Sequence, residues 1–409
     1  MDQRKLYRTI ESFASERMGT EEELLSHVLE QIIRNENIEF KGGRIWKLIP
    51  QKGVYRLLQQ RGEVEKIKNN YEIKIENYPM FLDIAENRTL LAEETHPYFL
   101  RKGILRFSAV GIGEKVRWQD TKVYPYCMTF TVDNLDQSLF YTLSIIGSAL
   151  NFLLKARHVE AEAFQLEQDL DKAREIQKRI LPEHELRFHD YELYGISVPD
   201  RVVGGDFFDY LETEDFDRLG IVIGDAASKG LSAAAQALYI SGALRLGFEY
   251  QSKISTLMGK INRLMNRTFS DEHFVSLFYG ELTHDKRGLM IYANAGHNNP
   301  ILLRGKTGEV ESLEPTGQLL GPFPDQRYQT ESTTIEPGDI LLLYTDGISE
   351  AMSDRSEMYG EERLMDRLKT WKDLSAKEIA QLLIEDTETF NTHPTYTDDK
   401  TVVIVKRIR

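Results

Sequence analysis

The nine residues VVGGDFFDY (202–210) place an aspartate after two glycines and follow it with two phenylalanines and a second aspartate. Asp206 and Asp209 therefore lie in an otherwise apolar run. What such a stretch does depends on the other acidic residues that the chain supplies, and on where they lie.

Further aspartates occur where apolar, strand-like runs end or begin. Asp225 follows IVIG, Asp346 follows LLLYT, and the doublet Asp398 and Asp399 precedes KTVVIV. A single aspartate at such a point is usually a turn former or a helix cap. Several in one region repel one another unless a cation neutralises them, and their hard oxygen atoms suit Mg²⁺ or Mn²⁺. Two such ions roughly 3.5 to 4 Å apart can hold a hydroxide in line with a phosphorus atom.

Strand-like runs are numerous and closely spaced between residues 188 and 409. They include RLGIVIGD, HFVSLFYGEL, LMIYANAG, DILLLYTDG and TVVIVKRI. Helices are expected at 230–247, 252–268, 360–370 and 376–390. The strands are too close together for simple βαβ winding, so we expect sheets covered by a few helices.

A long helix is predicted to lead into this region and to end near Pro182. Its apolar residues alternate in steps of three and four, which is typical of a coiled-coil seam. The seam consists of Ala149, Phe152, Ala156, Val159, Ala163, Leu166, Leu170 and Ala173. The alternative is a long helix packed on its own domain. We favour a parallel coiled-coil homodimer, because the remaining surface of the helix is densely charged.

Six motifs occur in order between about residues 173 and 409: AREIQKRILPE, GGDFFDY, GDAASKGLSAA, NAGHNNPILL, YTDGISEA and DDKTVVIV. They resemble the motifs of the metal-dependent PPM-type serine/threonine phosphatases of the SpoIIE/RsbU group. GGDFF also looks like GGDEF, the signature of cyclases that make cyclic di-GMP. Such a cyclase needs a further acidic ligand upstream of Gly-Gly-Asp, where this chain is mostly coiled coil. The phosphatase interpretation is therefore preferred.

The resemblance implies a metal site with two Mn²⁺ or Mg²⁺ ions. Asp206 and Asp225 would bridge or flank the metals, and Asp346 and Asp398 would complete the shell; these four would be the catalytic residues. The backbone carbonyl of Ala226 would be a further ligand. Asp399 is an alternative to Asp398, because the sequence alone does not resolve the doublet.

Three positions are open to more than one interpretation. Asp209 is either a ligand or a helper of the turn. His297, in NAGHNNP, is either an acid or part of a structural segment. Ser228 stands where the family commonly has glycine, which would strain the turn if that position needs a positive φ angle.

The region before the long helix reads as a small α+β domain. TEEELLSHVLEQIIR (20–34) is predicted to be a helix with a capping box formed by Thr20 and Glu23. The short strands GRIWKLIP, GVYRLLQQ, GILRFSAVGIG and YPYCMTFTVD follow it. The layout resembles a GAF domain and implies a sensor whose ligand the sequence does not identify. The predicted α+β architecture is thus a GAF-like sensor domain (14–145), a coiled-coil linker helix (146–182) and a PPM-type phosphatase β-sandwich flanked by helices (188–409).

Composition limits the location and the partners of the chain. It has 409 residues, of which 41% are hydrophobic and 28% charged, as in soluble globular proteins. A net charge of −14 gives no electrostatic support for nucleic-acid binding. The single cysteine, Cys127, fits a reducing cytoplasm and is expected to be a buried small hydrophobe. Residues 1–17 are charged throughout and lack the apolar core of a signal peptide.

One apolar segment has about the length of a membrane span. QSLFYTLSIIGSALNFLL (137–154) carries no charge, but Ser, Thr, Gly and Asn interrupt it and a charged helix continues from it. We interpret it as a buried, interface-forming helix and expect no membrane association.

Two functions remain open from the sequence. The first is a sensor-controlled protein serine/threonine phosphatase; the resemblance implies a phosphorylated STAS-type anti-sigma-factor antagonist as its substrate, in a bacterial partner-switching pathway. The second is a catalytically weak or inactive phosphatase fold that only binds a partner. The altered GDAASKG turn favours the second, and the retention of every metal carboxylate favours the first.

Overall fold

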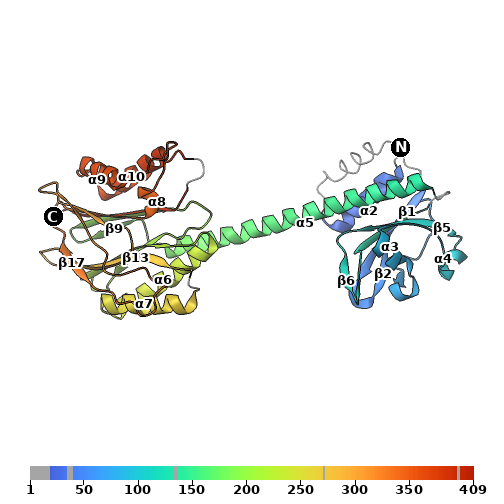
Figure 1. Cartoon of the computed structure of the whole chain (residues 1–409), viewed down its shortest axis with the longest axis horizontal. Coiled ribbons are helices and arrows are strands. Elements are labelled where there is room, and N and C mark those ends of the chain that lie inside the picture. The colour runs from blue at the N-terminus through green and yellow to red at the C-terminus, as the bar shows by residue number, and fades with distance from the viewer. Residues whose placement is uncertain (1–18, 35–39, 132–135, 270–271, 394–396) are drawn as a thin grey trace. The chain divides into compact units, whose positions relative to one another are not determined.

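The computed structural model describes residues 19–34, 40–131, 136–269, 272–393 and 397–409, and the chain forms two compact units, Met1–Gln165 and Leu166–Arg409 (Figure 1). The predicted start of the GAF-like domain at residue 14 and the predicted helix start near residue 135 lie outside the described residues.

The N-terminal unit is one antiparallel sheet with helices on both faces. The sheet has the strand order β3-β2-β1-β8-β5-β4. Its elements are α2 (Glu21–Arg34), β1 (Gly42–Ile49), β2 (Val54–Gly62), β3 (Glu72–Lys74), α3 (Met80–Asn87), β4 (Thr89–Glu93), α4 (Pro97–Arg101), β5 (Arg106–Ile112), the β6–β7 hairpin (Val116–Trp118, Thr121–Val123), β8 (Tyr126–Thr131) and the first part of α5 (Gln137–Ile180).

Alternation along the strands separates two cores in this unit. On β8, Met128 and Phe130 pack with α2 and α5, whereas Cys127 points to the opposite face, where α3 and α4 lie. Cys127 is fully buried, as its apolar surroundings predicted. The predicted capping box begins α2, because the Glu23 amide donates to Thr20 Oγ1 at 3.1 Å and the Thr20 amide donates to Glu23 Oε2 at 3.2 Å.

Helix α5 contains the apolar segment considered above as a membrane span. Of the helices in the described ranges, it is the one long and apolar enough to cross a membrane by length and composition. Leu143, Ile146 and Leu150 are fully buried on α5, in the core of the N-terminal unit. Core packing therefore accounts for much of the apolar character of this segment.

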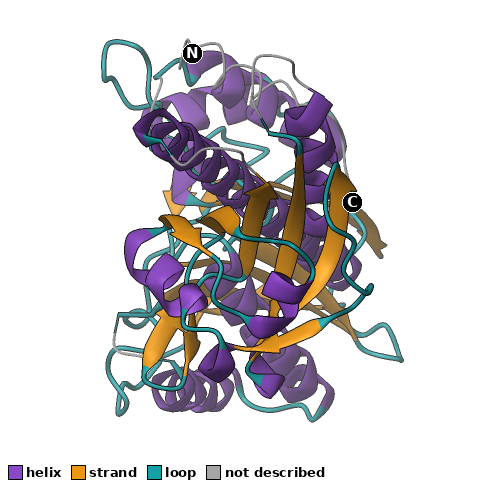
Figure 2. Cartoon of the chain, turned by 90° about the vertical axis from the view of Figure 1, so that its right-hand side faces the viewer, coloured by secondary structure: helices purple, strands orange, loops and turns teal. Residues whose placement is uncertain are grey.

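The C-terminal unit is a four-layered sandwich of two antiparallel sheets with helices on both outer faces (Figure 1). Figure 2 colours the helices, strands and loops of the chain by type. One sheet has the order β16-β15-β18-β19-β10-β9 and the other the order β11-β12-β13-β14-β17. The elements are β9 (Glu185–Phe188), β10 (Tyr191–Val198), β11 (Phe207–Glu212), β12 (Arg218–Ala226), α6 (Leu231–Glu249), α7 (Ile254–Thr268), β13 (Val275–Thr283), β14 (Leu289–Ala295), β15 (Ile301–Leu303), β16 (Val310–Ser312), β17 (Glu331–Thr334), β18 (Ile340–Tyr344), α8 (Asp346–Ser349), α9 (Glu361–Thr370), α10 (Ala376–Phe390) and β19 (Lys400–Arg407).

The apolar strand runs are explained by burial on both faces of each sheet. On β19, Val403 and Val405 lie in the core between the sheets, whereas Val402 and Ile404 pack against α8, α9 and α10. On β12, Ile221 and Ile223 likewise face the other sheet, while α6 and α7 cover the outer face. The four helices expected in this region are confirmed as α6, α7, α9 and α10.

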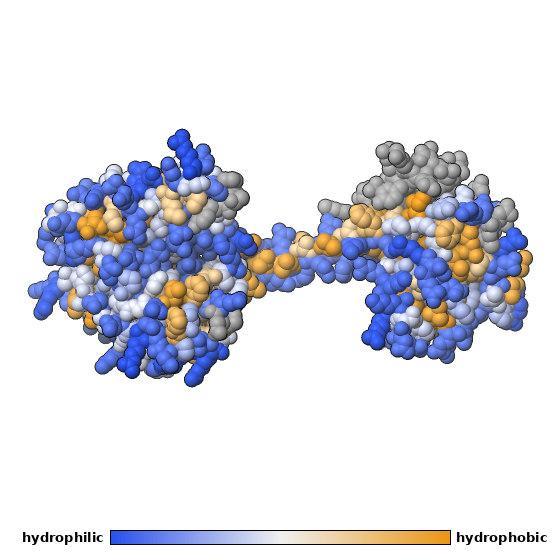
Figure 3. All heavy atoms as spheres, viewed as in Figure 1, coloured by the Kyte–Doolittle hydropathy of each residue, from blue (hydrophilic) through white to orange (hydrophobic). Residues whose placement is uncertain are grey.

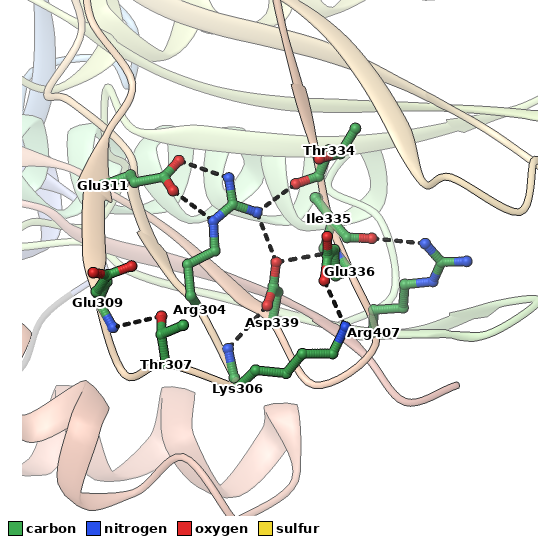
Figure 4. A network of polar contacts seen from close by, with 11 residues as sticks. Arg304, Lys306, Thr307, Glu309, Glu311, Thr334, Ile335, Glu336, Asp339 and Arg407 are labelled. Atoms are coloured by element: carbon green, nitrogen blue, oxygen red, sulfur yellow. Dashed lines mark hydrogen bonds and ion pairs between the residues drawn. The ribbon is translucent and has the colours of Figure 1, made fainter.

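A polar network holds the edge of the first sheet at the start of β18 (Figure 4). Arg304 pairs with Glu311 of β16 through two contacts of 2.6 Å, and its Nη1 contacts Oδ2 of the buried Asp339 at 2.8 Å. The other oxygen of Asp339 accepts from the Gly305 amide at 2.9 Å. Asp339 precedes β18 and Asp346 follows it. This network therefore holds the end of β18 that is opposite to Asp346.

Candidate active site

The predicted acidic residues lie at the ends of strands from both sheets. Asp206 immediately precedes β11, and Asp225 lies near the end of β12. Because Phe207 pairs with Gly224 in this antiparallel ladder, these two aspartates lie at the same end of the hairpin. Strands β18 and β19 belong to the other sheet. Asp346 begins α8 two residues after the end of β18, and Asp398 lies two residues before β19.

A threonine joins the two sheets at this end. Thr345 Oγ1, at the end of β18, donates to Asp206 Oδ2 at 2.6 Å and accepts from the Thr401 amide of β19 at 2.9 Å. Thr345 is fully buried and Asp206 is only 3% exposed. Thr345 thus orients the Asp206 carboxylate. Thr345 lies in YTDGISEA directly before Asp346, but no sequence pattern indicates its contact with Asp206.

The carboxyl groups of this site affect one another electrostatically. Burial and, next, the Asp225 carboxylate raise the pKa of Asp206 well above its usual range. Burial, followed by the carboxylates of Asp346 and Asp398, raises the pKa of Asp225 to about 7. Burial and Asp398 raise the pKa of Asp346 to about 6. The largest of these shifts is the one at Asp206, the most deeply buried of the three carboxyl groups.

A lysine provides positive charge beside these acids. Lys229 Nζ lies 3.3 Å from Asp398 Oδ1 and donates to the Thr397 carbonyl at 3.2 Å. It follows the turn after β12 and also acts on Asp346, whose pKa it lowers slightly against the larger effects of burial and Asp398. One partly exposed ammonium group does not balance this many carboxylates.

The contacts of the 398–399 doublet differ between its two members. Asp399 Oδ1 accepts from the Asp200 amide at 2.8 Å, and its Oδ2 accepts from the Gly205 amide at 2.6 Å. Both oxygens of Asp399 therefore hold the loop before β11 in place. The side chain of Asp398 instead faces Lys229 and is 37% exposed. These contacts favour Asp398 as the ligand and give Asp399 a positioning role.

The Gly-Gly-Asp loop passes close to the end of β12. A Cβ atom on Gly205 would lie 2.8 Å from the Ala226 carbonyl oxygen, so a larger residue would push the two segments apart. The Ala226 carbonyl accepts from the Ser228 amide at 2.7 Å and keeps a second lone pair. The glycine thus brings Asp206 and the Ala226 carbonyl together.

The structure answers the questions about Asp209, His297 and Ser228. Asp209 is buried and pairs with Arg245 of α6 at 2.6 Å, so it braces a helix. His297 is buried beside Ser276 at 2.8 Å, and burial lowers its pKa to about 4, which suits a structural residue. Ser228 does not have a positive φ angle, unlike Gly230 at 71°, so the expected strain is absent there.

A glutamine of α5 contacts the Gly-Gly-Asp loop. Gln177 Nε2 donates to the Gly204 carbonyl at 2.8 Å, and the Gly204 amide donates to Gln177 Oε1 at 3.3 Å. Gln177 is 8% exposed, although it lies in a densely charged helix. No sequence pattern predicts this contact, because a polar residue on a charged helix is normally solvated.

The donor set fits hard divalent cations. The site offers carboxylate oxygens and a backbone carbonyl, the ligands that Mg²⁺ and Mn²⁺ prefer, and it holds an excess of negative charge. In the described ranges, no three acidic, histidine or cysteine side chains already form a ready-made ligand set.

Comparison with known proteins agrees with this geometry. Residues 215–408 match the family model described as stage II sporulation protein E (SpoIIE). Within the C-terminal unit, residues 215–408 form a SpoIIE-type domain. The match includes Asp225, Asp346 and Asp398, whereas Asp206 lies just before it. The SiaA-PP2C domain of Pseudomonas aeruginosa shares the fold, with a TM-score of 0.52 and 22% identity over 61% of this chain and 99% of that domain. The expected α+β fold with a PPM-type sandwich is thus confirmed, while the GAF resemblance stays a prediction.

Two curated relatives are similar to part of the chain. Protein IcfG of Synechocystis sp. is 30% identical over 55% of this chain and 40% of its own length. Phosphoserine phosphatase RsbU of Bacillus subtilis is 25% identical over 46% of this chain and 56% of its own length. The chain therefore spans about half the length of the curated relatives that it matches.

Proposed function

We propose that the SpoIIE-type domain hydrolyses phosphoserine or phosphothreonine on a protein and requires two Mn²⁺ or Mg²⁺ ions. The observation that carries this proposal is the meeting of Asp206, Asp225, Asp346 and Asp398 at one end of both sheets. These four carboxylates, with the Ala226 carbonyl, would hold the metals. When bound, the metals would activate water and neutralise the phosphate charge.

The protein residues then have distinct tasks in this proposal. Thr345 orients Asp206 through its 2.6 Å hydrogen bond, and Asp399 holds the Gly-Gly-Asp loop through the Gly205 amide. Lys229 supplies a cation at the edge of the site, 52% exposed, where an incoming phosphate can reach it. None of these three residues needs to exchange a proton with the substrate.

We further propose that the substrate is a phosphorylated STAS-domain protein in a partner-switching pathway, and that the enzyme acts in the cytoplasm. The likeness to RsbU, which is named a phosphoserine phosphatase, supports the choice of a phosphoserine protein. The alternative of an inactive interaction module depended on strain at Ser228. Because Ser228 adopts an ordinary backbone conformation, that support is removed.

Regulation is proposed to pass from a GAF-like sensor (14–145) through the linker helix (146–182) to the catalytic domain (188–409). Figure 3 shows apolar side chains on the exposed surface of α5. Phe152, Val159, Leu166 and Ile176 are 59%, 56%, 62% and 54% exposed, respectively. Exposure of so many large apolar side chains on one helix favours their burial against a second copy in a coiled-coil dimer.

The test of the catalytic proposal is hydrolysis of a phosphoserine peptide by the full chain with Mn²⁺, with Mg²⁺ and after chelation. We expect turnover with either metal and none without. Phosphate release that is equal before and after exhaustive chelation would reject the two-metal site. A correctly folded chain without turnover in either metal would favour the interaction module.

A further inference from the structure

A small pocket lies in the N-terminal unit, on the face of the sheet covered by α3 and α4. Trp46, Phe99 and Phe107 line it with aromatic surface, and Arg44 and Glu94 contribute charged groups. Its volume is about 20 Å³, enough for one or two water molecules before the lining moves. A pocket that combines apolar walls with a few polar groups is typical of small-molecule sites.

Arg44 is the unusual group in this pocket. Its side chain is buried, with the residue 4% exposed, and its Nη2 donates to the Glu65 carbonyl at 2.6 Å. Its buried Nε has no hydrogen-bond partner, and Arg44 forms no ion pair with any described residue. Burial lowers the pKa of Arg44 to about 10, against the smaller opposing effects of Glu65 and Glu94. A buried donor without an acceptor is costly, so Arg44 Nε is the atom of this guanidinium that a ligand would stabilise by accepting a hydrogen bond.

The nearby carboxylate does not fill that role, because its oxygens are already engaged. Glu94 accepts from the Tyr78 hydroxyl at 2.7 and 2.8 Å and from the amides of Thr95 and His96 at 2.8 and 2.7 Å. It thereby holds the start of α4. The indole of Trp46 is also engaged, since its Nε1 donates to Thr129 Oγ1 at 3.3 Å. Among the buried polar atoms of these lining residues, Arg44 Nε is the one left without a hydrogen-bond partner.

We propose that this pocket binds a small organic carboxylate, with its carboxylate on Arg44 and its apolar body against Trp46, Phe99 and Phe107. A guanidinium group matches the planar geometry of a carboxylate. Because the Glu94 carboxylate also lines the pocket, a doubly charged phosphate would add more buried negative charge than a carboxylate does. A cationic ligand would lie beside the Arg44 guanidinium and be repelled by it.

Binding at this pocket is independent of the phosphatase activity, whereas any effect of binding on turnover rests on the proposed function. The experiment is therefore a binding measurement on the full chain. Isothermal titration is run with acetate, butyrate and benzoate, and each carboxylate is compared with its neutral amide. We expect at least one carboxylate to bind while its amide does not. Binding by none of the three, or equal binding by acid and amide, overturns the proposal.

Arg44→Gln removes the positive charge and keeps a polar side chain. It should weaken carboxylate binding at least tenfold. Arg56→Gln is the matched control, because Arg56 lies on the neighbouring strand β2 and pairs with Glu72 at 2.7 Å outside the pocket. It should bind as the unmodified chain does. Equal affinity of the Arg44 and unmodified chains would contradict the proposal.

Arg44 is buried, so its replacement can prevent folding, and a second variant tests the pocket without touching the charge. Phe107→Leu enlarges the apolar part of the pocket. It should raise the affinity for benzoate relative to that for acetate by severalfold. An unchanged ratio of the two affinities would show that the ligand body does not lie against Phe107, and the assignment would be wrong.

Discussion

The contact between Gln177 and Gly204 predicts that the linker helix controls the metal site. Gln177→Met preserves the length and volume of the side chain but removes both hydrogen bonds to the Gly-Gly-Asp loop. The Gly204 amide and carbonyl are then left buried without partners. Leaving two such groups unpaired costs about 2 to 4 kcal/mol, with the larger share at the 2.8 Å contact. At about 1.4 kcal/mol per tenfold change, the ordered loop becomes roughly 30- to 700-fold less favoured.

Because Asp206 follows this loop directly, disorder of the loop should weaken metal binding more than it weakens folding. The assay is phosphatase rate against Mn²⁺ concentration, with thermal unfolding followed in parallel. We expect the Mn²⁺ concentration for half-maximal rate to rise by about 30-fold or more. The exposed Gln168 on the same helix supplies the matched control, Gln168→Met, which should leave the metal dependence unchanged.

Either of two results would refute this reasoning. A folded Gln177→Met variant with the original metal dependence would show that the loop holds its position without α5. An equal rise in the Mn²⁺ concentration for half-maximal rate in the Gln168→Met control would show that the effect arises from the surface of the helix and not from the contact with Gly204.

Four further outcomes are expected. Asp225→Asn should remove nearly all turnover without lowering the melting temperature, whereas Asp209→Asn should lower the melting temperature by leaving its arginine partner on α6 without a carboxylate. Exhaustive chelation should abolish activity, and added Mn²⁺ or Mg²⁺ should restore it. Val159→Glu combined with Leu166→Glu should give a monomer in sedimentation, with activity insensitive to deletion of residues 1–140; a monomer that still responds to that deletion would exclude the helix pair as the route. Because burial lowers the pKa of His297 to about 4, the unfolded chain binds a proton below pH 6.5 that the folded chain does not. The raised pKa values of Asp225 and Asp346 act in the opposite direction in this pH range, so the contribution of His297 is read from a comparison with His297→Gln. The free energy of unfolding of the unmodified chain, minus that of His297→Gln, should fall by about 3 kcal/mol as the pH is lowered from 6.5 to 4.

The sandwich could be predicted from the sequence because its signals are local and repeated. Apolar runs such as TVVIV bury both faces of a strand, and the intervening helices carry clear periodicity. The position of Asp225 and Asp346 at strand ends follows from the same pattern. The fold class is therefore visible in residues that are close together along the chain.

The parts that the sequence could not supply depend on backbone contacts between distant segments. Asp398 and Asp399 are identical side chains in adjacent positions, and only the amides of Asp200 and Gly205 distinguish them. Thr345 resembles any threonine after a strand until its hydroxyl reaches Asp206, which lies 139 positions away in the other sheet. The buried Arg44 similarly looks like an ordinary polar residue in a strand.

The last turn of α5 carries both a side chain that would face a second helix and the side chain that contacts the Gly-Gly-Asp loop. Ile176 is 54% exposed and Gln177 is 8% exposed, although they are neighbours in the chain. Neighbouring residues of an α-helix point about 100° apart, so one turn offers an apolar side chain outward while it holds the Gly-Gly-Asp loop on another side. Rotation of this turn on pairing with a second helix would therefore move Gln177 relative to Gly204. Because Gly204 and Asp206 belong to the same short loop, a movement of Gln177 would also change the position of Asp206.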